Sequence, residues 1–262
     1  METARITRVD ALEVRVCGAS ATMARAAARD VADYLRRVLS EQAGAVVILA
    51  SAASQVIFLE ELTKWEGIDW SRVTLFHMDE YLGIREDHPA SFRRFLRERV
   101  EMRVHPKAFH YVRGEADQPI RECDRYAALL RAQPIDLCCL GIGENGHVAF
   151  NDPPVADFED QRWVKLVKLD EACRRQQVGE GAFPELGMVP EYAYTLTVPA
   201  LCSARRMICV VPERRKAEAV RRALTVPVSR ECPASVLRRQ GHAVLFLDDD
   251  SASLWLGAGH AA

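Results

Sequence analysis

Short apolar runs alternate with longer amphipathic segments along most of this chain of 262 residues. The run AVVILA at 45–50 is continuously aliphatic, as expected of a strand that is covered on both faces. Residues 20–42 are rich in Ala, Arg and Leu and start with Ser20 as a candidate N-cap, which predicts a long helix. Strands that alternate with helices pair in parallel through right-handed crossovers. The alternation therefore predicts an α/β fold, with a doubly wound, mostly parallel sheet and helices on both faces, as in Rossmann-like proteins.

The same patterns predict the other elements. Strands are expected at 9–16, 72–78, 109–112, 135–140, 163–169, 192–198, 206–211 and 243–247, and helices at 54–64, 91–102, 119–132, 213–224 and near the end of the chain. Neither a linker nor a solenoid-type repeat interrupts the alternation. We therefore expect one domain over residues 1–262.

Charge and composition exclude several classes of protein. A formal net charge of −2 gives no electrostatic reason to bind nucleic acid or an anionic membrane. The start METARITRVD lacks the apolar core of a signal peptide, and no run approaches the roughly 18 apolar residues of a spanning helix. The 8 cysteines form no CxxC pair and mostly interrupt apolar runs. We expect a cytoplasmic protein that needs no metal and no organic cofactor.

Ligands of open parallel sheets bind beyond the carboxyl ends of the strands, where loops lead into helices. This rule places acids, a histidine and cations at one edge of the predicted sheet. The segments concerned are Ser51 to Gln55, Asp79 to Tyr81, Gly141 to Pro154, Asp170 to Gln177 and Pro212 to Lys216.

One of these segments also matches the GxGxxG pattern of dinucleotide-binding proteins. Gly141, Gly143 and Gly146 follow a predicted strand, and Asp170 ends the next one. A dinucleotide site needs a helix that begins at the third glycine and faces the pyrophosphate. Here HVAFNDPP follows, and its two prolines stop any helix within two turns. The residues that follow the third glycine therefore argue against a dinucleotide cofactor.

Three polar positions are candidates for acid–base chemistry or anion binding. His147 lies in a Gly-rich loop with Asp152 five residues on, and a carboxylate on one ring nitrogen raises the basicity of the other. A histidine considered alone is more often structural than catalytic. Asp79 lies directly after a predicted buried strand and is either a helix cap or a proton carrier. The 51–55 loop offers hydroxyls and N–H groups at a helix start, which suit either phosphate binding or simple capping.

Two longer motifs resemble the glucosamine-6-phosphate deaminase/isomerase family, whose relatives include the 6-phosphogluconolactonases. Met78-Asp79-Glu80-Tyr81 resembles the family's MDEY segment, and GIGENGHVAFNDP at 141–153 resembles its G-hydrophobic-G-x-D-G-H-[IV]-A-F-N-E-P loop. The segments at 87–92 and 194–197 are similar to two further family motifs. The resemblance covers roughly residues 45–250 and implies the same α/β fold.

The resemblance implies a role for each matching residue. Asp79 matches the base that abstracts the C2 proton, and His147 matches the histidine that opens the sugar ring, with Asp152 and Asn145 beside it. Substrate-binding positions are implied for the remaining matches: Ser51, Ala52, Ala53 and Ser54 of the phosphate loop, Glu80, Gly146, and the cations Arg174 and Lys216.

Three positions depart from the family pattern. Asn145 replaces an aspartate two residues before the histidine, Asp152 replaces a longer glutamate, and the glycines of the phosphate loop are absent from ASAAS. An amide at 145 is neither a base nor an anion, so charge support for His147 falls to Asp152 or to Glu144.

The implied reaction is the conversion of a 2-amino-2-deoxyhexose 6-phosphate, such as glucosamine 6-phosphate, to fructose 6-phosphate and ammonia. The alternatives are a 6-phosphogluconolactonase-type hydrolase and a sugar-phosphate-binding regulator with weakened catalysis. Tyr81 and the FNDP ending at 150–153 resemble the deaminases and favour that activity, because the lactonases usually have Arg after Asp-Glu and a different ending of the loop. A small-molecule sugar phosphate is the expected partner, and a homo-oligomer is left open.

Overall fold

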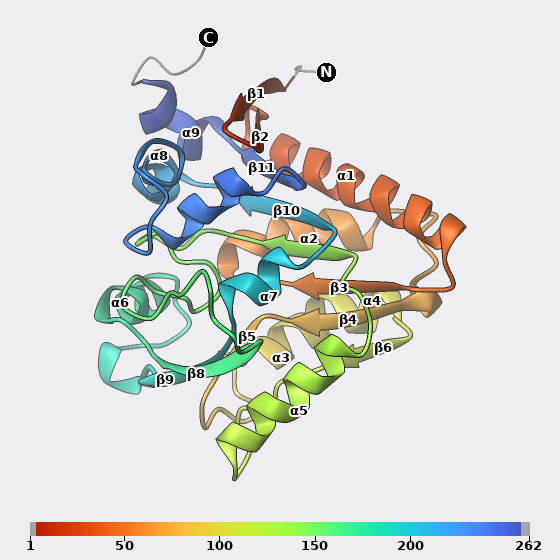
Figure 1. Cartoon of the computed structure of the whole chain (residues 1–262), viewed down its shortest axis with the longest axis vertical. Coiled ribbons are helices and arrows are strands. Elements are labelled where there is room, and N and C mark those ends of the chain that lie inside the picture. Colours follow the sequence, from red (N-terminus) through yellow and green to blue (C-terminus); the bar gives the residue numbers. More distant parts are fainter. Residues whose placement is uncertain (1–3, 258–262) are drawn as a thin grey trace.

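The main sheet of the protein has eight strands in the order β1-β2-β11-β10-β7-β3-β4-β6, in a computed structural model that describes residues 4–257 (Figure 1). All neighbouring strands pair in parallel except β1 and β2. The predicted doubly wound, mostly parallel α/β fold is therefore confirmed. The strands are β1 (Arg5–Val9), β2 (Leu12–Val16), β3 (Ala45–Leu49), β4 (Val73–His77), β6 (Ala108–His110), β7 (Leu137–Leu140), β10 (Arg206–Val211) and β11 (Ala243–Leu247).

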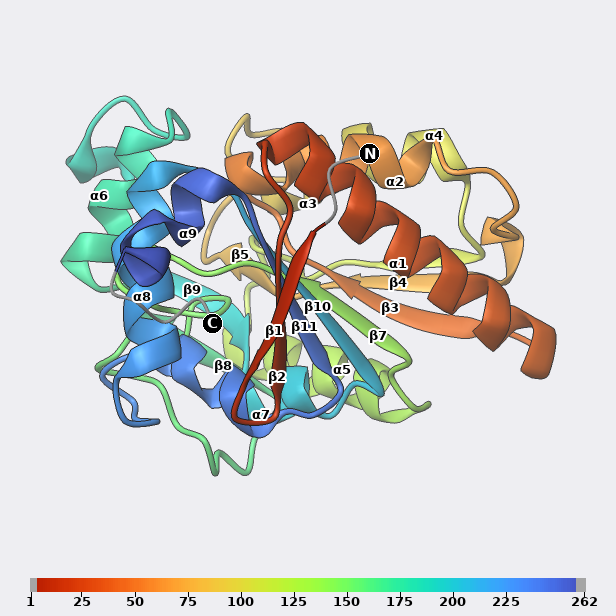
Figure 2. The ribbon, with the colours of Figure 1, turned by 90° about the horizontal axis from the view of Figure 1, so that it is seen from above.

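The central strand β3 shows why helices cover both faces of this sheet. All its side chains are buried, and they alternate between two apolar cores. Val47 and Leu49 pack in the core under α1 (Ser20–Glu41) and α2 (Val56–Thr63). Val46 and Ile48 pack in the other core, under α5 (Pro119–Arg131) and α7 (Val198–Cys202). Figure 2 shows the two helical layers on opposite sides of the sheet.

The other helices are α3 (Phe92–Leu96), α4 (Met102–Val104), α6 (Glu171–Gly179), α8 (Ala217–Thr225) and α9 (Asp249–Leu256). The single helix expected at 91–102 is instead divided, because a π-helical turn at Arg97–Glu101 separates α3 from α4. Residues 4–257 contain no helix that is both long and apolar enough to cross a membrane.

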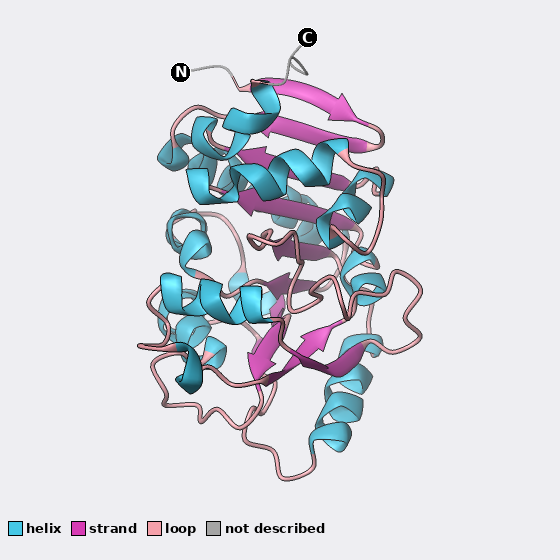
Figure 3. Ribbon diagram, turned by 90° about the vertical axis from the view of Figure 1, so that its left-hand side faces the viewer, coloured by secondary structure: helices cyan, strands magenta, loops and turns pink. Residues whose placement is uncertain are grey.

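A second, antiparallel sheet lies beside the mostly parallel sheet and was not expected from the sequence. Its strands are β5 (Asp79–Tyr81), β9 (Tyr192–Leu196) and β8 (Val164–Lys168), in the order β5-β9-β8 (Figure 3). The segments near 163–169 and 192–198 are strands as expected, but they lie outside the main sheet. Residues 79–81, expected as a loop, form β5, because the chain continues beyond β4 in extended form and pairs with β9.

Two local assignments were also wrong. Residues 9–16 do not form one strand, since a tight turn at Asp10, with φ of 53°, folds β1 back on β2. Residues 170–177, expected as a loop, belong mostly to α6, and the Asp170 side chain caps this helix by accepting from the Ala172 N–H at 3.4 Å.

Candidate active site

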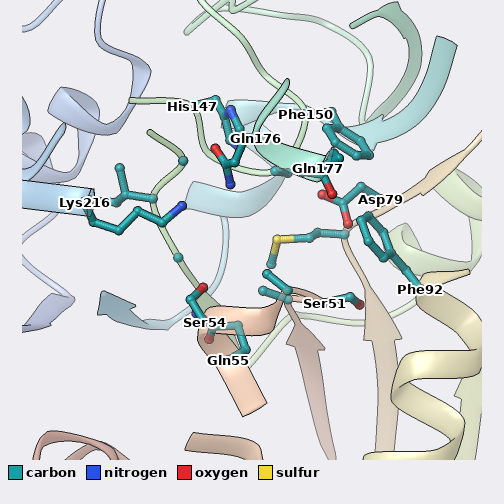
Figure 4. Close-up of a pocket in the computed structure, with 17 residues that line it drawn as sticks. Ser51, Ser54, Gln55, Asp79, Phe92, His147, Phe150, Gln176, Gln177 and Lys216 are labelled. Carbon is teal, nitrogen blue, oxygen red and sulfur yellow. The ribbon is translucent and has the colours of Figure 1, made fainter. Parts of the chain in front are cut away.

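A pocket lies at the carboxyl ends of β3, β4, β7 and β10, where the sheet topology places ligands. Figure 4 shows Lys216 on one side of the pocket and Asp79 on the other, with the Ser51–Gln55 segment between them. The lining residues come from loops far apart in the sequence: Ala50, Ser51, Ala52, Ser54, Gln55, Met78, Asp79, Phe92, Gly141, Ile142, Gly143, His147, Ala149, Phe150, Gln176, Gln177 and Lys216.

The loop after β3 forms the floor of the pocket on one side. Ser51, Ala52 and Ser54 line it, whereas Ala53 does not. The Ser51 hydroxyl oxygen is buried and has no hydrogen-bond partner among residues 4–257. Gln55 fastens the loop to the sheet, because its Nε2 donates to the Val210 carbonyl at 3.0 Å. The loop leads through a 3-10 turn into α2, so it presents a hydroxyl group and N–H groups at a helix start.

Asp79 occupies the junction between the two sheets. It is the first residue of β5, its side chain lines the pocket, and it is only 6% exposed. Its Oδ1 is buried without a hydrogen-bond partner among the described residues. Burial, and then the neighbouring Glu80 charge, raise the pKa of Asp79 well above its ordinary value. A carboxyl group in this state is a strong base once it is ionised.

Glu80 does not reach the pocket, although the sequence placed it among the substrate-binding residues. Strand alternation turns it to the opposite side of β5, where its carboxylate accepts from the N–H groups at the start of α3. Its partners are the Tyr81, Phe92 and Arg93 N–H groups and the Ser91 hydroxyl, at 2.8–3.2 Å. Burial raises its pKa to about 7, against these hydrogen bonds, which lower it. Glu80 is thus placed to anchor α3.

His147 and Asp152 form a hydrogen-bonded pair in the loop after β7. The Nδ1 atom of His147 lies 2.9 Å from Oδ1 of Asp152. Burial alone would raise the pKa of Asp152, but its hydrogen bond to His147 and that ring's charge, together with the Asn145 amide and the Asp170 N–H, lower it. The carboxylate therefore stays ionised and leaves Nε2 of His147 as the ring atom available for proton transfer.

Asn145 does not touch the pocket and instead links the members of this pair. Its Nδ2 donates to Oδ1 of Asp152 at 2.9 Å, and its Oδ1 accepts from the His147 N–H at 2.9 Å. The departure from aspartate at this position thus supplies a donor where a carboxylate would supply another acceptor. The role of Asn145 is to hold Asp152 and the loop in place.

Two glycines of the loop have steric reasons to be glycine. A Cβ atom added to Gly143 would lie 2.2 Å from Cε1 and from Nε2 of His147, so the ring occupies that space. Gly146, expected to bind substrate, does not line the pocket; it has φ of 91° and packs against Cys232. Beyond Gly146 the chain forms a tight bridge between Val148 and Asn151 rather than a helix, so the third glycine of the pattern faces no helix N-terminus.

Only one of the two expected phosphate-binding cations reaches the pocket. Lys216, just before α8, lines it with 2% of its surface exposed. Its Nζ lies 3.5 Å from the buried Glu180 carboxylate. Burial lowers the pKa of Lys216, and the charges of Glu180 and Glu144 partly offset this effect. Arg174 lies elsewhere, since its guanidinium donates to the Leu186 and Val189 carbonyls at 2.8 and 2.9 Å.

Sequence reasoning missed several side chains of the pocket. Gln176 and Gln177 line it from α6, a helix that was expected to be a loop. Phe92 and Phe150 form an apolar wall and stack with ring centroids 5.7 Å apart. The adjacent amides were visible in the sequence, but only a correctly predicted α6 would have indicated which side of the helix faces the pocket.

One group of side chains in the described residues has metal-ligating atoms close together. His147, Asp152 and Cys173 offer atoms within 4.8 Å of one another. Both oxygens of Asp152 already accept hydrogen bonds, from His147 and Asn145 on one side and from the Asp170 N–H on the other. This arrangement is that of a hydrogen-bonded histidine–carboxylate pair.

The fold and the pocket together define an α/β protein equipped for acid–base chemistry on a small molecule. The family model described as glucosamine-6-phosphate isomerases/6-phosphogluconolactonase matches residues 18–246 of the chain. The chain belongs to this family.

Individual relatives agree with this assignment. The chain is 35% identical over 219 residues to a glucosamine-6-phosphate deaminase of Exiguobacterium sibiricum, with 84% of each chain covered. It is 33% identical over 247 residues to a glucosamine-6-phosphate deaminase of Pseudarthrobacter chlorophenolicus, with 92% of each covered.

Solved structures are similar over nearly the whole chain. A monomeric glucosamine-6-phosphate deaminase has a TM-score of 0.85 and 29% identity, covering 92% of this chain and 99% of that one. A 6-phosphogluconolactonase of Thermotoga maritima has a TM-score of 0.73 at 20% identity, covering 90% and 98%. At that identity the second likeness concerns the fold alone.

Proposed function

We propose that this protein converts a 2-amino-2-deoxyhexose 6-phosphate, with glucosamine 6-phosphate as the first candidate, to the 2-ketose 6-phosphate and ammonia. The observation that carries the proposal is that Asp79 and the His147–Asp152 pair line or support one pocket. This reaction needs a base for a carbon-bound proton and a separate group that moves protons between oxygens, and the pocket provides both.

The phosphate of the substrate would bind between the 51–54 loop and Lys216. Ser51, Ser54 and the N–H groups at the start of α2 supply neutral donors, and Lys216 supplies a positive charge. The Glu180 carboxylate, 3.5 Å from Nζ of Lys216, partly balances this charge. With the phosphate held there, the other end of the sugar extends towards Asp79.

His147 acts first in the proposed reaction, which begins with the cyclic sugar. It transfers the proton of the C1 hydroxyl to the ring oxygen, which opens the ring and leaves an aldehyde at C1. An aldehyde at C1 makes the C2–H bond acidic, because the electrons of that bond can delocalise on to the carbonyl oxygen.

Asp79 then moves the proton from C2 to C1. It removes the C2 proton while the C1 oxygen takes a proton from His147, which gives an enolamine. It returns the proton to C1, the nitrogen lone pair forms a C2–N double bond, and His147 recovers its proton from the nitrogen or solvent. Water adds to C2 and ammonia leaves, so the product is the ketose phosphate.

The raised pKa of Asp79 fits this sequence of steps. Burial favours the neutral carboxyl group of Asp79. A substrate that carries an ammonium group at C2 would place a positive charge beside Asp79 and stabilise the carboxylate. Binding would therefore generate the base next to the proton that it removes. This ammonium group releases one proton to solvent before the enolamine forms, which frees the nitrogen lone pair that the later step uses.

Replacing Asp79 tests the function directly. Asp79→Asn should lower kcat by about 10²–10⁴-fold with little change in substrate affinity, since it removes a proton carrier but leaves the shape unchanged. It should also abolish exchange of the C2 proton with deuterium from the solvent. Asp124→Asn, at an exposed position on α5, is the matched control. Full ammonia release and full exchange by Asp79→Asn would exclude the mechanism.

Lactone hydrolysis is the second candidate, because the His147–Asp152 pair could also activate water. That reaction has no need of a second, buried carboxyl group in the pocket, which is why we favour the deaminase. Assays for ammonia release from hexosamine 6-phosphates and for opening of 6-phosphogluconolactone separate the two. A protein that binds these compounds without turnover would be the regulator.

We also propose a cytoplasmic location. All 8 cysteines are free and all but Cys202 are buried, as suits a reducing compartment. Light scattering of the purified protein would distinguish a monomer from a homo-oligomer.

A further inference from the structure

Strand alternation in β5 places Tyr81 on the same side as Asp79. The Tyr81 ring is fully buried and packs between Phe92, Phe150 and Phe183, with ring centroids 5.0–5.4 Å away. Phe92 and Phe150 also line the pocket. The position of the Tyr81 hydroxyl is therefore held by packing on several sides, within the same short strand that carries Asp79.

This hydroxyl determines the orientation of the Gln177 amide. Tyr81 donates from its hydroxyl to Oε1 of Gln177 at 2.7 Å, and this is the only hydrogen bond of the hydroxyl within residues 4–257. A buried hydroxyl proton needs an acceptor, so the amide must present its carbonyl oxygen to Tyr81. Its Nε2 then points away from Tyr81, and no acceptor for it occurs among the described residues.

The neighbouring Gln176 is arranged differently. Its Oε1 accepts from the Glu144 N–H at 2.9 Å and its Nε2 donates to Glu180 at 2.8 Å. The first bond joins α6 to the 141–147 loop and the second lies at the end of α6 itself, so both ends of this amide are engaged. Of the two adjacent amides in the pocket, only that of Gln177 has an Nε2 group without an acceptor among the described residues.

Gln177 is only 6% exposed and its side chain borders the pocket. Figure 4 draws Gln177 on the same side of the pocket as Asp79, opposite Lys216. A donor whose direction is fixed and which has no protein acceptor is suited to form a hydrogen bond with an acceptor on a ligand.

We propose that Gln177 is a specificity residue that donates from Nε2 to the C3 hydroxyl oxygen of the sugar, with Tyr81 as its positioning residue. The inference rests on the proposed function, which places the phosphate at Lys216 and the reacting carbons C1 and C2 at Asp79. C2 has C1 and C3 as its carbon neighbours. His147 exchanges protons with the C1 oxygen in the proposed reaction, so the C3 hydroxyl is the neighbouring acceptor left for a donor on the Asp79 side.

The test compares substrates that differ by one hydroxyl. Wild-type protein and the variants Gln177→Ala, Gln177→Glu and Tyr81→Phe are assayed with glucosamine 6-phosphate and with its 3-deoxy and 4-deoxy analogues. For wild type, loss of the C3 hydroxyl should lower kcat/KM by about tenfold, the effect of one neutral hydrogen bond. In Gln177→Ala this discrimination should shrink to about twofold or less, while discrimination at C4 stays as in wild type.

The other variants separate recognition from folding. Gln177→Glu keeps an acceptor for Tyr81 but loses the donor, so it should also lose discrimination at C3. Tyr81→Phe keeps the ring and frees the amide, so its discrimination should be intermediate. Gln161→Ala, at an exposed glutamine outside the pocket, should match wild type. Unchanged discrimination at C3 in both Gln177 variants, or its loss at C4 instead, would overturn the proposal.

A binding measurement keeps this inference distinct from the proposed function. Calorimetry with 2-amino-2-deoxyglucitol 6-phosphate, an open-chain compound that cannot react, and its 3-deoxy form gives the same discrimination as a ratio of Kd. Wild type that binds the glucitol but releases no ammonia would refute deamination, and the Kd ratio would still decide the role of Gln177. Failure of wild type to bind the glucitol would refute both.

Discussion

The substitution Gly143→Ala offers a sharp test of where the His147 ring lies. The Cβ atom of alanine would lie 2.2 Å from Cε1 and from Nε2 of the ring and 2.4 Å from its Cδ2. Nonbonded carbon atoms approach to about 3.5–4.0 Å, so the ring must retreat by more than about 1 Å. The hydrogen bond between His147 and Asp152, 2.9 Å long, resists that movement.

The expected loss of activity follows from this displacement. A misplacement of about 1 Å in a catalytic group costs about 10²-fold in rate, so kcat/KM for ammonia release should fall at least that far. Overpacking should also lower the free energy of unfolding by about 1–3 kcal/mol. The backbone itself does not oppose alanine, because Gly143 has no positive φ.

Two further variants isolate the steric cause. Gly179→Ala, where a Cβ atom meets open space and φ is ordinary, should leave activity unchanged. In a His147→Ala background the ring is absent, so Gly143→Ala should cost no stability and should give the gain of about 0.4–1 kcal/mol typical of such changes. Near-wild-type activity of Gly143→Ala, or an equal loss of stability in both backgrounds, would refute the placement of the ring.

Four other expectations follow from the site. Lys216→Ala should raise KM for a phosphorylated substrate by at least about tenfold and change kcat less, because Lys216 would bind the phosphate equally in the ground state and in the transition state. An unchanged KM would mean that the anion binds elsewhere. Arg174→Ala should lower Tm but leave KM alone, because its guanidinium holds the 186–189 segment and does not reach the pocket. Because the pKa of Asp79 is raised, the rising limb of the kcat/KM–pH profile should lie well above pH 4, where the carboxylate forms. A rising limb near pH 4 would contradict the burial of Asp79. Asn145→Asp should move the pH–rate profile to higher pH. The new carboxyl group would face Asp152 across 2.9 Å, and repulsion between two carboxylates would make the pair retain a proton to higher pH. An unmoved profile would mean that Asn145 only shapes the loop.

Much of the candidate site could be predicted from local sequence. The buried run AVVILA and the elements that alternate after it indicated the parallel sheet, and the sheet indicated the edge at which a pocket forms. The loop 141–153 is long and specific, so it identified His147, Asp152 and Asn145, and these prove to be hydrogen-bonded neighbours. One domain over residues 1–262 stays a prediction.

The second sheet could not be predicted, and it decides how several residues of the site are oriented. Its strand β5 has three residues, too few to show an alternating pattern, and it pairs with β9, which lies more than a hundred residues further on. That pairing turns Asp79 into the pocket and Glu80 away from it, although the two are adjacent in the sequence.

The orientation of α6 likewise depends on tertiary packing and could not be predicted from its sequence. Arg174 has the charge expected of a phosphate ligand, but the helix turns it towards the 186–189 segment and turns Gln177 towards the pocket. Residue type and spacing thus determined the sheet, the loops and the acid–base groups. Which side chains face the pocket was decided only by long-range pairing and packing, because side-chain direction depends on the partners that a short strand or helix finds in the folded chain.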